Sequence, residues 1–503
     1  MLRRTLSTMC AASASATAST PKLRPEFSEL AGPQNVPILD QLLGYYVNVQ
    51  SRKLYYKDAL RMEHQAVRWA YADIRKNSEA LAQGLLCQGL RPAETMLAVQ
   101  PCNCETYMMQ LACAKIGALC AVVPHHDISA DKLRGYLNQF QPRHFMGREW
   151  IVVPDGKGKE MKERNLHFWD TIYNVIPELG MCYPGQKMQW IHSQEFTWLK
   201  KCIITDHNMN LLGTEPLRRI LVWGPFSYYE NRLRRMSQLL HPDDPVLALM
   251  DPKPALEDKT FIVYSHRNCA NAGFIFANLL GLKAETRFGV LPNHHTDPIG
   301  AIVANYAALT SGAVLVNTHD NLFTDEHCIA VLEKMCVEEI SGLLGTKQDF
   351  DVLMRHASNF DQDQYEHLKW IALFESAGDE AISQEYLQTL KKTFYVDDVF
   401  VFRGTMESAY MVSWRSLAKG ELGLVPHTQL KIVGDRGSVD AKILSRNTRG
   451  NLRLRGPQVS PYYYSNAGLM TELLDERGWV STSREAIIGK DGQWSTFATP
   501  QTY

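Results

Sequence analysis

The chain has 503 residues, and its 53 Lys and Arg residues against 54 Asp and Glu residues give a formal net charge of −1. A chain without a net basic field gives no electrostatic reason to expect nucleic acid or an acidic membrane surface as a partner. Its 45% hydrophobic and 21% charged residues are ordinary for a globular protein that buries at least two cores. No stretch is long and apolar enough to span a bilayer, so we expect no transmembrane segment.

Residues 1–25 form a separate compositional unit, rich in Ser, Thr and Ala, and the first acidic residue is Glu26. An acid-poor, basic N-terminus of this kind is typical of a mitochondrial transit peptide, and a plain disordered tail is the alternative. A secretory signal would need a longer apolar run. The basic residues of the segment are Arg3, Arg4, Lys22 and Arg24.

The 11 cysteines are irregularly spaced, and Cys102 and Cys104 are the only close pair. Without a second pair or a histidine knuckle, this pair indicates core or loop thiols rather than a metal site. Reduced thiols are typical of an intracellular compartment. Together with the N-terminal segment, they favour the mitochondrial matrix.

In chain order, helical spacing of apolar residues over 78–86 predicts a helix that ends near Gly89. A strand over 96–99 follows, then a helix over 105–116 closed by Gly117, then a buried strand over 118–124. This alternation favours an α/β domain with a mostly parallel sheet.

The same region carries family motifs. They are Tyr71, Asp73, Ile74 and Arg75, then Leu81, Ala82, Gly84 and Leu85, then all of 109–118 except Cys113, and finally Val123 and Pro124. This order resembles the N-terminal subdomain of AMP-forming acyl-CoA synthetases of the adenylate-forming superfamily, nearest the mitochondrial medium-chain acyl-CoA ligase branch. Further family blocks follow in order, at 265–268, 291–300, 402–408 and 450–456, with Tyr462 and Tyr463 after them.

The resemblance covers residues 35–497 and implies an AMP-binding, acyl-CoA synthetase-like domain. The expected fold is the large α/β N-terminal domain of that family, built of packed α/β subdomains, without the small C-terminal lid domain that carries a catalytic lysine. Residues 498–503 would then be a short tail.

The loop that would hold the triphosphate departs most from the family. The resemblance implies a Thr-Ser-Gly-Thr-Thr-Gly-x-Pro-Lys-Gly loop, whose glycines let backbone N–H groups approach phosphate. Here the loop from Pro252 to Phe261 reads Pro-Lys-Pro-Ala-Leu-Glu-Asp-Lys-Thr-Phe. Proline lacks the N–H donor, and Glu257 and Asp258 would repel phosphate. The sequence therefore predicts weakened binding of ATP.

Two further substitutions affect nucleotide binding. The family holds ribose with the aspartate of a Tyr-x-Thr-Gly-Asp motif, and Arg484 stands at that position. Arginine only donates hydrogen bonds, and a shift to Glu485 would place the side chain on the other face of a strand. Arg403 replaces an aromatic residue and leaves the adenine stack in doubt, although a guanidinium also stacks.

Gly404, Thr405 and Glu407 match the family's Gly-Thr-x-Glu block, in which the glutamate helps to hold magnesium. They are the candidate residual cofactor-binding residues. The alternative is a Gly404 turn followed by a solvated glutamate, and the altered phosphate loop favours that alternative.

In the block that lines the family's acyl pocket, Asp297 aligns with a histidine and Gly300 ends the block. Both are candidate substrate-pocket residues. The preceding His294 and His295 form a His-His-x-Asp pattern that suggests metal or acid–base chemistry. The pattern lacks the helical i, i+4 spacing of a zincin, so polar residues on a loop are the favoured interpretation and no metal ligand is assigned.

These features together predict a catalytically inactive acyl-CoA synthetase-like protein of mitochondria that acts as a binding or scaffold subunit. No catalytic residue and no cofactor are expected. The alternatives are a divergent fatty-acid–CoA ligase using ATP, Mg²⁺ and CoA, or a protein that binds an acyl chain or lipid in the old pocket. A mitochondrial protein complex or an acyl ligand is the expected partner. The basic run over 230–235 predicts a solvated helix face rather than a nucleic-acid site.

Overall fold

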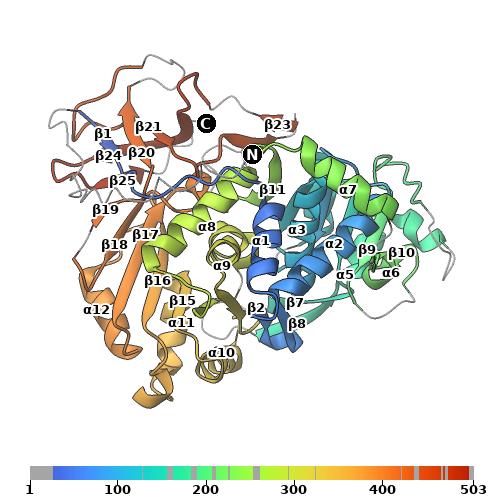
Figure 1. The fold of residues 1–503 in the computed structure, drawn as a ribbon, viewed down its shortest axis with the longest axis horizontal. Helices are drawn as coiled ribbons and strands as arrows, with labels where there is room; N and C mark the ends of the chain where they lie inside the picture. Colours follow the sequence, from blue (N-terminus) through green and yellow to red (C-terminus); the bar gives the residue numbers. More distant parts are fainter. Residues whose placement is uncertain are drawn as a thin grey trace, which may run out of the picture.

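A computed structural model describes residues 27–497 except 127, 156–161, 183–189, 207–210, 225–226, 253–260, 293, 323, 421, 435–440, 466–467 and 471–473. The expected transit peptide, the expected tail over 498–503 and the interior of the altered phosphate loop lie outside the described residues. Layers of helix and sheet make up the described part (Figure 1), as expected for an α/β fold built of packed subdomains.

The first large sheet has the strand order β10-β9-β6-β4-β5-β11-β12-β22-β23. Pairing is parallel from β10 to β11 and antiparallel from β11 to β23. Its central strands are buried along their whole length, as a parallel sheet covered on both faces requires. The strands are β4 (Thr95–Val99), β5 (Leu119–Val123), β6 (His144–Gly147), β9 (Lys201–Ile204), β10 (Thr214–Pro216), β11 (Pro245–Met250), β12 (Phe261–Ser265), β22 (Tyr462–Ser465) and β23 (Gly468–Met470).

The second large sheet has the order β19-β18-β17-β16-β15-β13-β14-β2-β3. It is parallel from β17 to β2, with antiparallel strands at both edges. The strands are β2 (Asp58–Met62), β3 (Val67–Ala70), β13 (Arg287–Val290), β14 (Val314–Asn317), β15 (Gly342–Thr346), β16 (Trp370–Ser376), β17 (Asp398–Gly404), β18 (Ser413–Ser416) and β19 (Leu422–Leu424).

A smaller antiparallel sheet of β1 (Glu29–Ala31), β20 (Gln429–Val433), β21 (Gly450–Arg455), β24 (Val480–Ile488) and β25 (Trp494–Phe497) lies at one end of the molecule (Figure 1). Strand β1 pairs with β20, so the described fold begins before residue 35. Strands β7 (Trp150–Asp155) and β8 (Lys162–His167) form a separate hairpin.

A layer of helices packs between the two large sheets, and one hydrophobic cluster joins it to the facing sides of both. The helices of this layer are α1 (Leu43–Lys53), α2 (Tyr71–Cys87), α3 (Cys104–Ile116), α8 (His266–Leu280) and α9 (Asn305–Ser311). On the outer faces, α4 (Ala130–Phe140) and α5 (Phe168–Val175) cover the first sheet. The outer helices of the second sheet are α10 (Asp325–Val337), α11 (Lys347–Ala357) and α12 (Gln384–Thr393).

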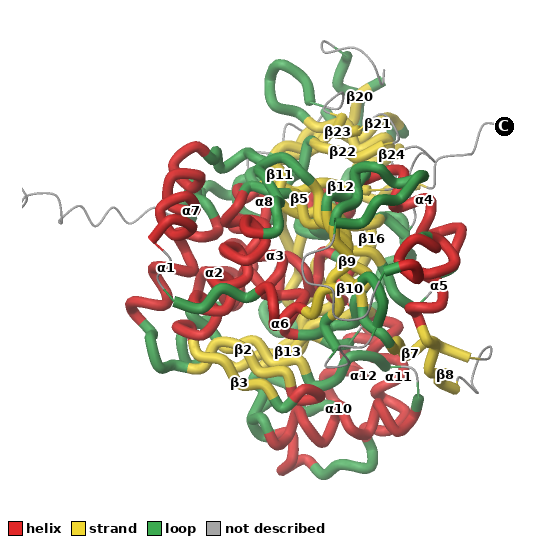
Figure 2. The backbone as a smooth tube through the Cα atoms, turned by 90° about the vertical axis from the view of Figure 1, so that its right-hand side faces the viewer, coloured by secondary structure: helices red, strands yellow, loops and turns green. Residues whose placement is uncertain are grey.

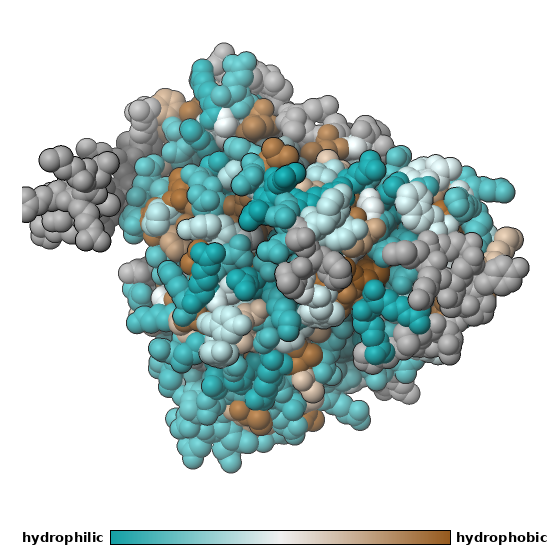
Figure 3. Space-filling view, turned by 45° about the vertical axis from the view of Figure 1, so that its right-hand side comes forward, coloured by the Kyte–Doolittle hydropathy of each residue, from teal (hydrophilic) through white to brown (hydrophobic). Residues whose placement is uncertain are grey.

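Helices α1, α2 and α7 (Ser227–Leu239) lie side by side at one flank of the molecule (Figures 1 and 2), and the short α6 (Leu217–Ile220) contacts α2. The face seen in Figure 3 is mostly hydrophilic, with scattered hydrophobic residues. Within the described residues, the longest apolar helices still fall short of what a membrane span needs.

The local predictions for the N-terminal half are confirmed. The helix expected over 78–86 is part of α2, and the one expected over 105–116 is α3, which Gly117 ends in the left-handed conformation with φ 82°. Glycine adopts that conformation without a Cβ clash. The described cysteines form no disulfide, and the buried Cys102 and Cys104 lie in the core, as expected of structural thiols.

The crossing of α8 and α9 yields a test of core packing. A Cβ on Gly273 in α8 would lie 2.3 Å from the backbone carbon of Tyr306, so Gly273→Ala should lower the free energy of unfolding by about 1–3 kcal/mol. Gly135 in α4 has nothing within 4 Å of such a Cβ, and Gly135→Ala should instead raise it by about 1 kcal/mol. Urea unfolding of the two variants measures the difference, and equal midpoints would contradict the close approach.

Candidate functional site

The turn after β17 contains Gly404, Thr405 and Glu407, and the last of these lies in the 3₁₀ turn Met406–Ser408. A Cβ on Gly404 would lie 2.5 Å from the carbonyl carbon of Tyr410. The chain reverses so tightly that Tyr410 itself takes φ 59°. Glycine at 404 is therefore needed for backbone packing, whatever else this turn does.

The interpretation of Glu407 as a solvated glutamate is wrong, because its side chain is buried, with 1% of the residue exposed. Its Oε1 accepts a hydrogen bond of 2.6 Å from the hydroxyl of Tyr463 on β22. Burial, and then the charge of Glu407, raise the pKa of Tyr463 well above its usual value. The Oε2 of Glu407 and the Oγ1 of Thr405 have no hydrogen-bond partner among the described residues. Two buried acceptors thus remain open in the turn.

Arg484 on β24 points into the same buried space. Its Nη2 donates to Oδ2 of Asp251 at 2.8 Å, and Asp251 follows β11 directly before the altered phosphate loop. Burial lowers the pKa of Arg484, but the carboxylates of Glu407 and Asp251 outweigh burial and raise it overall. The next residue, Glu485, pairs with Arg449. Because neighbouring strand residues face opposite sides, Glu485 does not replace the ribose-binding aspartate.

Arg403, at the position of the family's aromatic residue, is engaged in contacts within its own sheet. Its Nη1 donates to Oε1 of Glu375 at 3.1 Å. Its Nη2 donates to the carbonyl oxygens of Ala377 at 2.9 Å and Asp379 at 3.3 Å. These bonds hold the loop after β16 and fix the position of the guanidinium.

His294 and His295, for which the sequence favoured polar residues on a loop, lie in the 3₁₀ turn His294–Thr296, where both are buried. The Nδ1 of His294 contacts Asp297, and its Nε2 lies 2.8 Å from Oδ2 of Asp349 on α11. Burial lowers the pKa of His294, but the two carboxylates outweigh burial and raise it well above its usual value. His294 is therefore a charged link between its turn and α11.

His295 is different from its neighbour. Its Nε2 lies 2.8 Å from the carbonyl oxygen of Gln100, and burial lowers its pKa to about 4. The described residues contain no group of His, Cys, Asp or Glu side chains arranged to hold a metal ion.

Gly300 is packed against the turn that precedes it, because a Cβ there would lie 2.4 Å from the carbonyl oxygen of His294. The cavity beside it, which His295, Cys102 and Asn317 also line, has a volume of about 20 Å³. That volume holds about one water molecule. The space beside this predicted pocket residue is far smaller than an acyl chain.

The two sets of predicted site residues, the turn from Gly404 to Glu407 and the block from Asp297 to Gly300, come together at Tyr410. Burial, and then the charges of Asp297 and Asp251, raise the pKa of its hydroxyl well above the usual value. Asp297, which is partly exposed, therefore lies near the buried pair of Asp251 and Arg484. Sequence reasoning missed the partners Asp251, Asp349 and Tyr410, although Asp251 directly precedes the altered loop and that position was the available signal.

Comparisons with known proteins support the family resemblance found in the sequence. Residues 48–171 match the AMP-binding enzyme family. The human medium-chain acyl-CoA ligase ACSF2, mitochondrial, is 23% identical over 461 residues, which cover 90% of this chain and 70% of that protein. The acyl-CoA ligase sidI of Aspergillus fumigatus is 23% identical over 94% of this chain and 75% of its own.

Solved structures show the same fold. A putative long-chain-fatty-acid CoA ligase from Rhodopseudomonas palustris superposes with a TM-score of 0.68 at 14% identity, over 91% of this chain and 98% of that one. The N-terminal domain of FACL13 from Mycobacterium tuberculosis superposes with a TM-score of 0.65 at 13% identity, over 91% and 99%. The described residues therefore have the fold of an acyl-CoA ligase N-terminal domain, as expected.

Removal of the buried guanidinium should be costly. Arg484→Met leaves the carboxylates of Asp251 and Glu407 without it, and we expect a loss of about 3–5 kcal/mol in the free energy of unfolding. Arg449→Met removes an exposed partner of Glu485 on the same sheet and should cost at most about 1 kcal/mol. Adding Glu407→Gln to Arg484→Met should recover part of the loss, because one uncompensated charge disappears. Equal unfolding midpoints for the two arginine variants would contradict this.

His294 should make stability depend on pH. Its pKa is raised in the folded state, so its contribution is complete below the unfolded value of about 6.5 and is lost as pH rises through the folded value. Asp349, whose pKa is lowered, loses its contribution as pH falls through its own folded value. The stability difference between wild type and His294→Gln should therefore shrink as pH rises from about 6.5. The matched control is His241→Gln at an exposed histidine, for which a parallel shrinkage would contradict the assignment.

Proposed function

We propose that this chain, a relative of the adenylate-forming acyl-CoA synthetases and similar to the medium-chain ligase ACSF2, is a catalytically inactive binding or scaffold subunit of mitochondria. The observation that carries the proposal is the ion pair between Arg484 and Asp251 beside Glu407. An arginine of the chain lies where the family places its ribose-binding aspartate.

The described residues do not fit magnesium-bound ATP. Ribose hydroxyls need an acceptor at position 484, and a guanidinium offers only donors. Mg²⁺ beside Glu407 would share the buried space with the positive charge of Arg484, and the two cations would repel each other. The phosphate loop, by its sequence, contains two prolines and no glycine, so it offers fewer N–H donors to phosphate. We assign no catalytic residue.

A divergent ligase is the second candidate, and a specific observation favours it. The Oε2 of Glu407 and the Oγ1 of Thr405 are buried without a partner among the described residues. Buried acceptors are rarely left open in a protein, and an unfilled one often marks a ligand or ion site. If Arg484 moved away, a cation that carries further ligands could bind to these two oxygen atoms. Binding of an acyl chain in the old pocket is less supported, since the cavity at Gly300 is only about 20 Å³.

The mitochondrial location is part of the proposal. Its support is the acid-poor N-terminal composition over residues 1–25 and the similarity to relatives described as mitochondrial. The matrix is the expected compartment, and a stable protein complex there is the expected partner. The tagged wild type and the tagged Arg484→Met variant are purified in parallel from mitochondria. The wild type should recover partners in stoichiometric amounts. Recovery of the chain alone after cross-linking would contradict a scaffold role.

The central test is catalysis. Loss of one preorganised donor costs about 2.7–4 kcal/mol of transition-state stabilisation, and several losses coincide here. We therefore expect no exchange of pyrophosphate into ATP with medium- or long-chain fatty acids, and no magnesium-dependent ATP binding by calorimetry. Glu407→Ala serves as the internal control. Robust exchange by the purified chain that Glu407→Ala abolishes would replace this proposal with the divergent ligase.

A further inference from the structure

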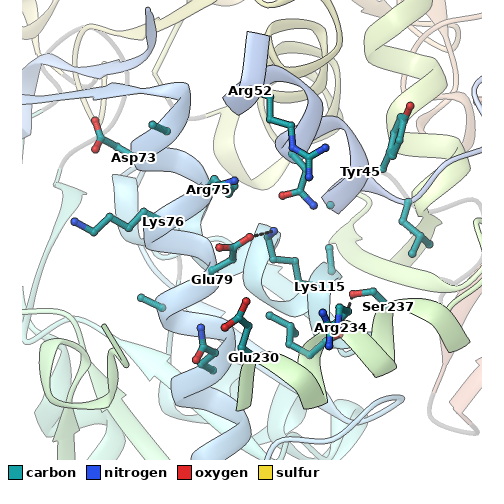
Figure 4. Close-up of a pocket in the computed structure, with 18 of the residues that line it drawn as sticks. Tyr45, Arg52, Asp73, Arg75, Lys76, Glu79, Lys115, Glu230, Arg234 and Ser237 are labelled. Atoms are coloured by element: carbon teal, nitrogen blue, oxygen red, sulfur yellow. Dashed lines mark hydrogen bonds and ion pairs between the residues drawn. The ribbon is translucent and has the colours of Figure 1, made fainter. Parts of the chain in front are cut away.

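A large cavity lies away from the Glu407 site, on the flank formed by α1, α2, α3 and α7 (Figures 1 and 4). Its volume is about 990 Å³, at the upper end of the range for small-molecule sites. It shares none of its lining residues with the turn at Glu407 or the cavity at Gly300. A ligand here would therefore be independent of any adenylate chemistry.

Cations from four helices line this cavity. They are Arg52 of α1, Arg75 and Lys76 of α2, Lys115 of α3 and Arg234 of α7. Figure 4 shows Arg52, Arg75 and Lys115 directed toward a common space. The structure gives no carboxylate within ion-pair distance of Arg52 or Arg75 among the described residues. Because Arg52 and Arg75 carry charges that no described acid pairs with, the space is attractive to an anion.

The acids of the cavity do not cancel this charge. Asp73 accepts a hydrogen bond of 3.0 Å from the backbone N–H of Ala70 and so caps its own helix. Glu79 lies 3.4 Å from the ammonium of Lys115. Glu230 is exposed on α7. The run over 230–235 that the sequence assigned to a solvated face thus contributes Glu230 and Arg234 to the cavity wall.

Lys115 is the most informative group of the cavity. Only 7% of the residue is exposed, and its ammonium has one acceptor, Glu79, at the long distance of 3.4 Å. An ammonium carries three donors, so two remain for another acceptor. Burial is costly for a charge that is weakly paired. Burial also lowers the pKa of Lys115; Glu79 opposes this effect only in part, and the nearby Arg75 adds to it.

Gln83 gives an independent sign of an incomplete site. It lines the same cavity, it is 7% exposed, and its Oε1 has no hydrogen-bond partner among the described residues. Side-chain amides at this depth are normally satisfied by protein or ligand. This oxygen is an acceptor, so it needs a donor, such as a hydroxyl or a protonated acid group of a ligand. At one wall of the cavity, Lys115 thus has donors beyond its bond to Glu79, and Gln83 has an open acceptor.

We propose that this cavity binds a small, multiply charged anion with phosphate or carboxylate groups, held by Lys115, Arg75 and Arg52. Half-exposed tyrosines of the same cavity, Tyr45 and Tyr55, offer flat apolar surface to a part of the ligand that carries no charge. The site goes beyond the proposed scaffold function and does not depend on it.

The acids at the cavity favour a small ligand over a nucleic acid or an acidic protein segment. Asp73 and Glu230 belong to the lining and would repel a long polyanion that extends across it. A compact anion can approach Lys115, Arg75 and Arg52 without crossing them. The volume of about 990 Å³ leaves room for such an anion together with an uncharged part.

The test uses the full chain and two probes, inorganic tripolyphosphate and citrate, in calorimetric titrations at low ionic strength. At least one should bind saturably with one site, and the arm that binds distinguishes phosphate from carboxylate recognition. Binding should weaken as salt rises, because exposed cations take part. Lys115→Met should weaken it at least about tenfold, as expected for loss of a charge-assisted hydrogen bond.

Arg75→Gln and Arg52→Gln keep the fold testable if Lys115→Met destabilises it, and each should weaken binding several-fold. Arg75→Lys should retain part of the affinity. The matched control is Lys392→Gln on α12, an exposed lysine outside the cavity, which should leave binding unchanged. Absence of binding by both probes at millimolar concentration overturns the proposal. Binding that is insensitive to Lys115, Arg75 and Arg52, or binding of an acidic peptide or oligonucleotide but neither probe, overturns it as well.

Discussion

The described fold depends on a buried set of charges where its three main sheets meet. Arg484 belongs to the small antiparallel sheet, Asp251 follows a strand of the first large sheet, and Glu407 follows a strand of the second. Tyr463, from the far part of the first sheet, completes the set through its hydrogen bond to Glu407. Because buried charges must be paired, the relative positions of the sheets are constrained by this one interaction. A second contact, from Trp494 to Ser413 at 3.1 Å, also joins the small sheet to the second.

The same charges bear on the proposed function, because a fold does not by itself fix the chemistry of its site. The family resemblance implies a metal and a nucleotide in this space, which would bring positive charge and hydroxyl donors. Here the guanidinium of Arg484 brings positive charge and N–H donors. Under the proposal, these buried charges serve the structure of the protein rather than catalysis. The cavity at Lys115 shows a different arrangement, because Arg52 and Arg75 have no acidic partner among the described residues and Lys115 has only Glu79 at 3.4 Å.

Sequence reasoning identified the turn at Gly404 and the loss at Arg484 from motif positions alone. It misjudged the exposure of Glu407 and did not foresee the burial of His294, since exposure cannot be read from a motif. Glu407 is buried because Tyr463, more than fifty residues later in the chain, packs against it and donates a hydrogen bond to its carboxylate. The pKa of His294 is raised in part because Asp349, on the helix α11 that covers the second sheet, lies 2.8 Å from its ring. Both partners are distant in sequence, and no local pattern marks them.

The sequence by itself determined two helices and two strands between residues 78 and 124, the α/β class and the absence of glycine from the phosphate loop. These follow from local periodicity, from caps such as Gly117, and from which residue types can present backbone donors. Only the tertiary structure decided which charges face each other and which cavity stays open. Electrostatic energies depend on distance and burial, and both are properties of packed elements rather than of neighbours in the chain. Lys115 illustrates this, since its helix is evident from sequence while its shortage of partners arises only where four helices meet.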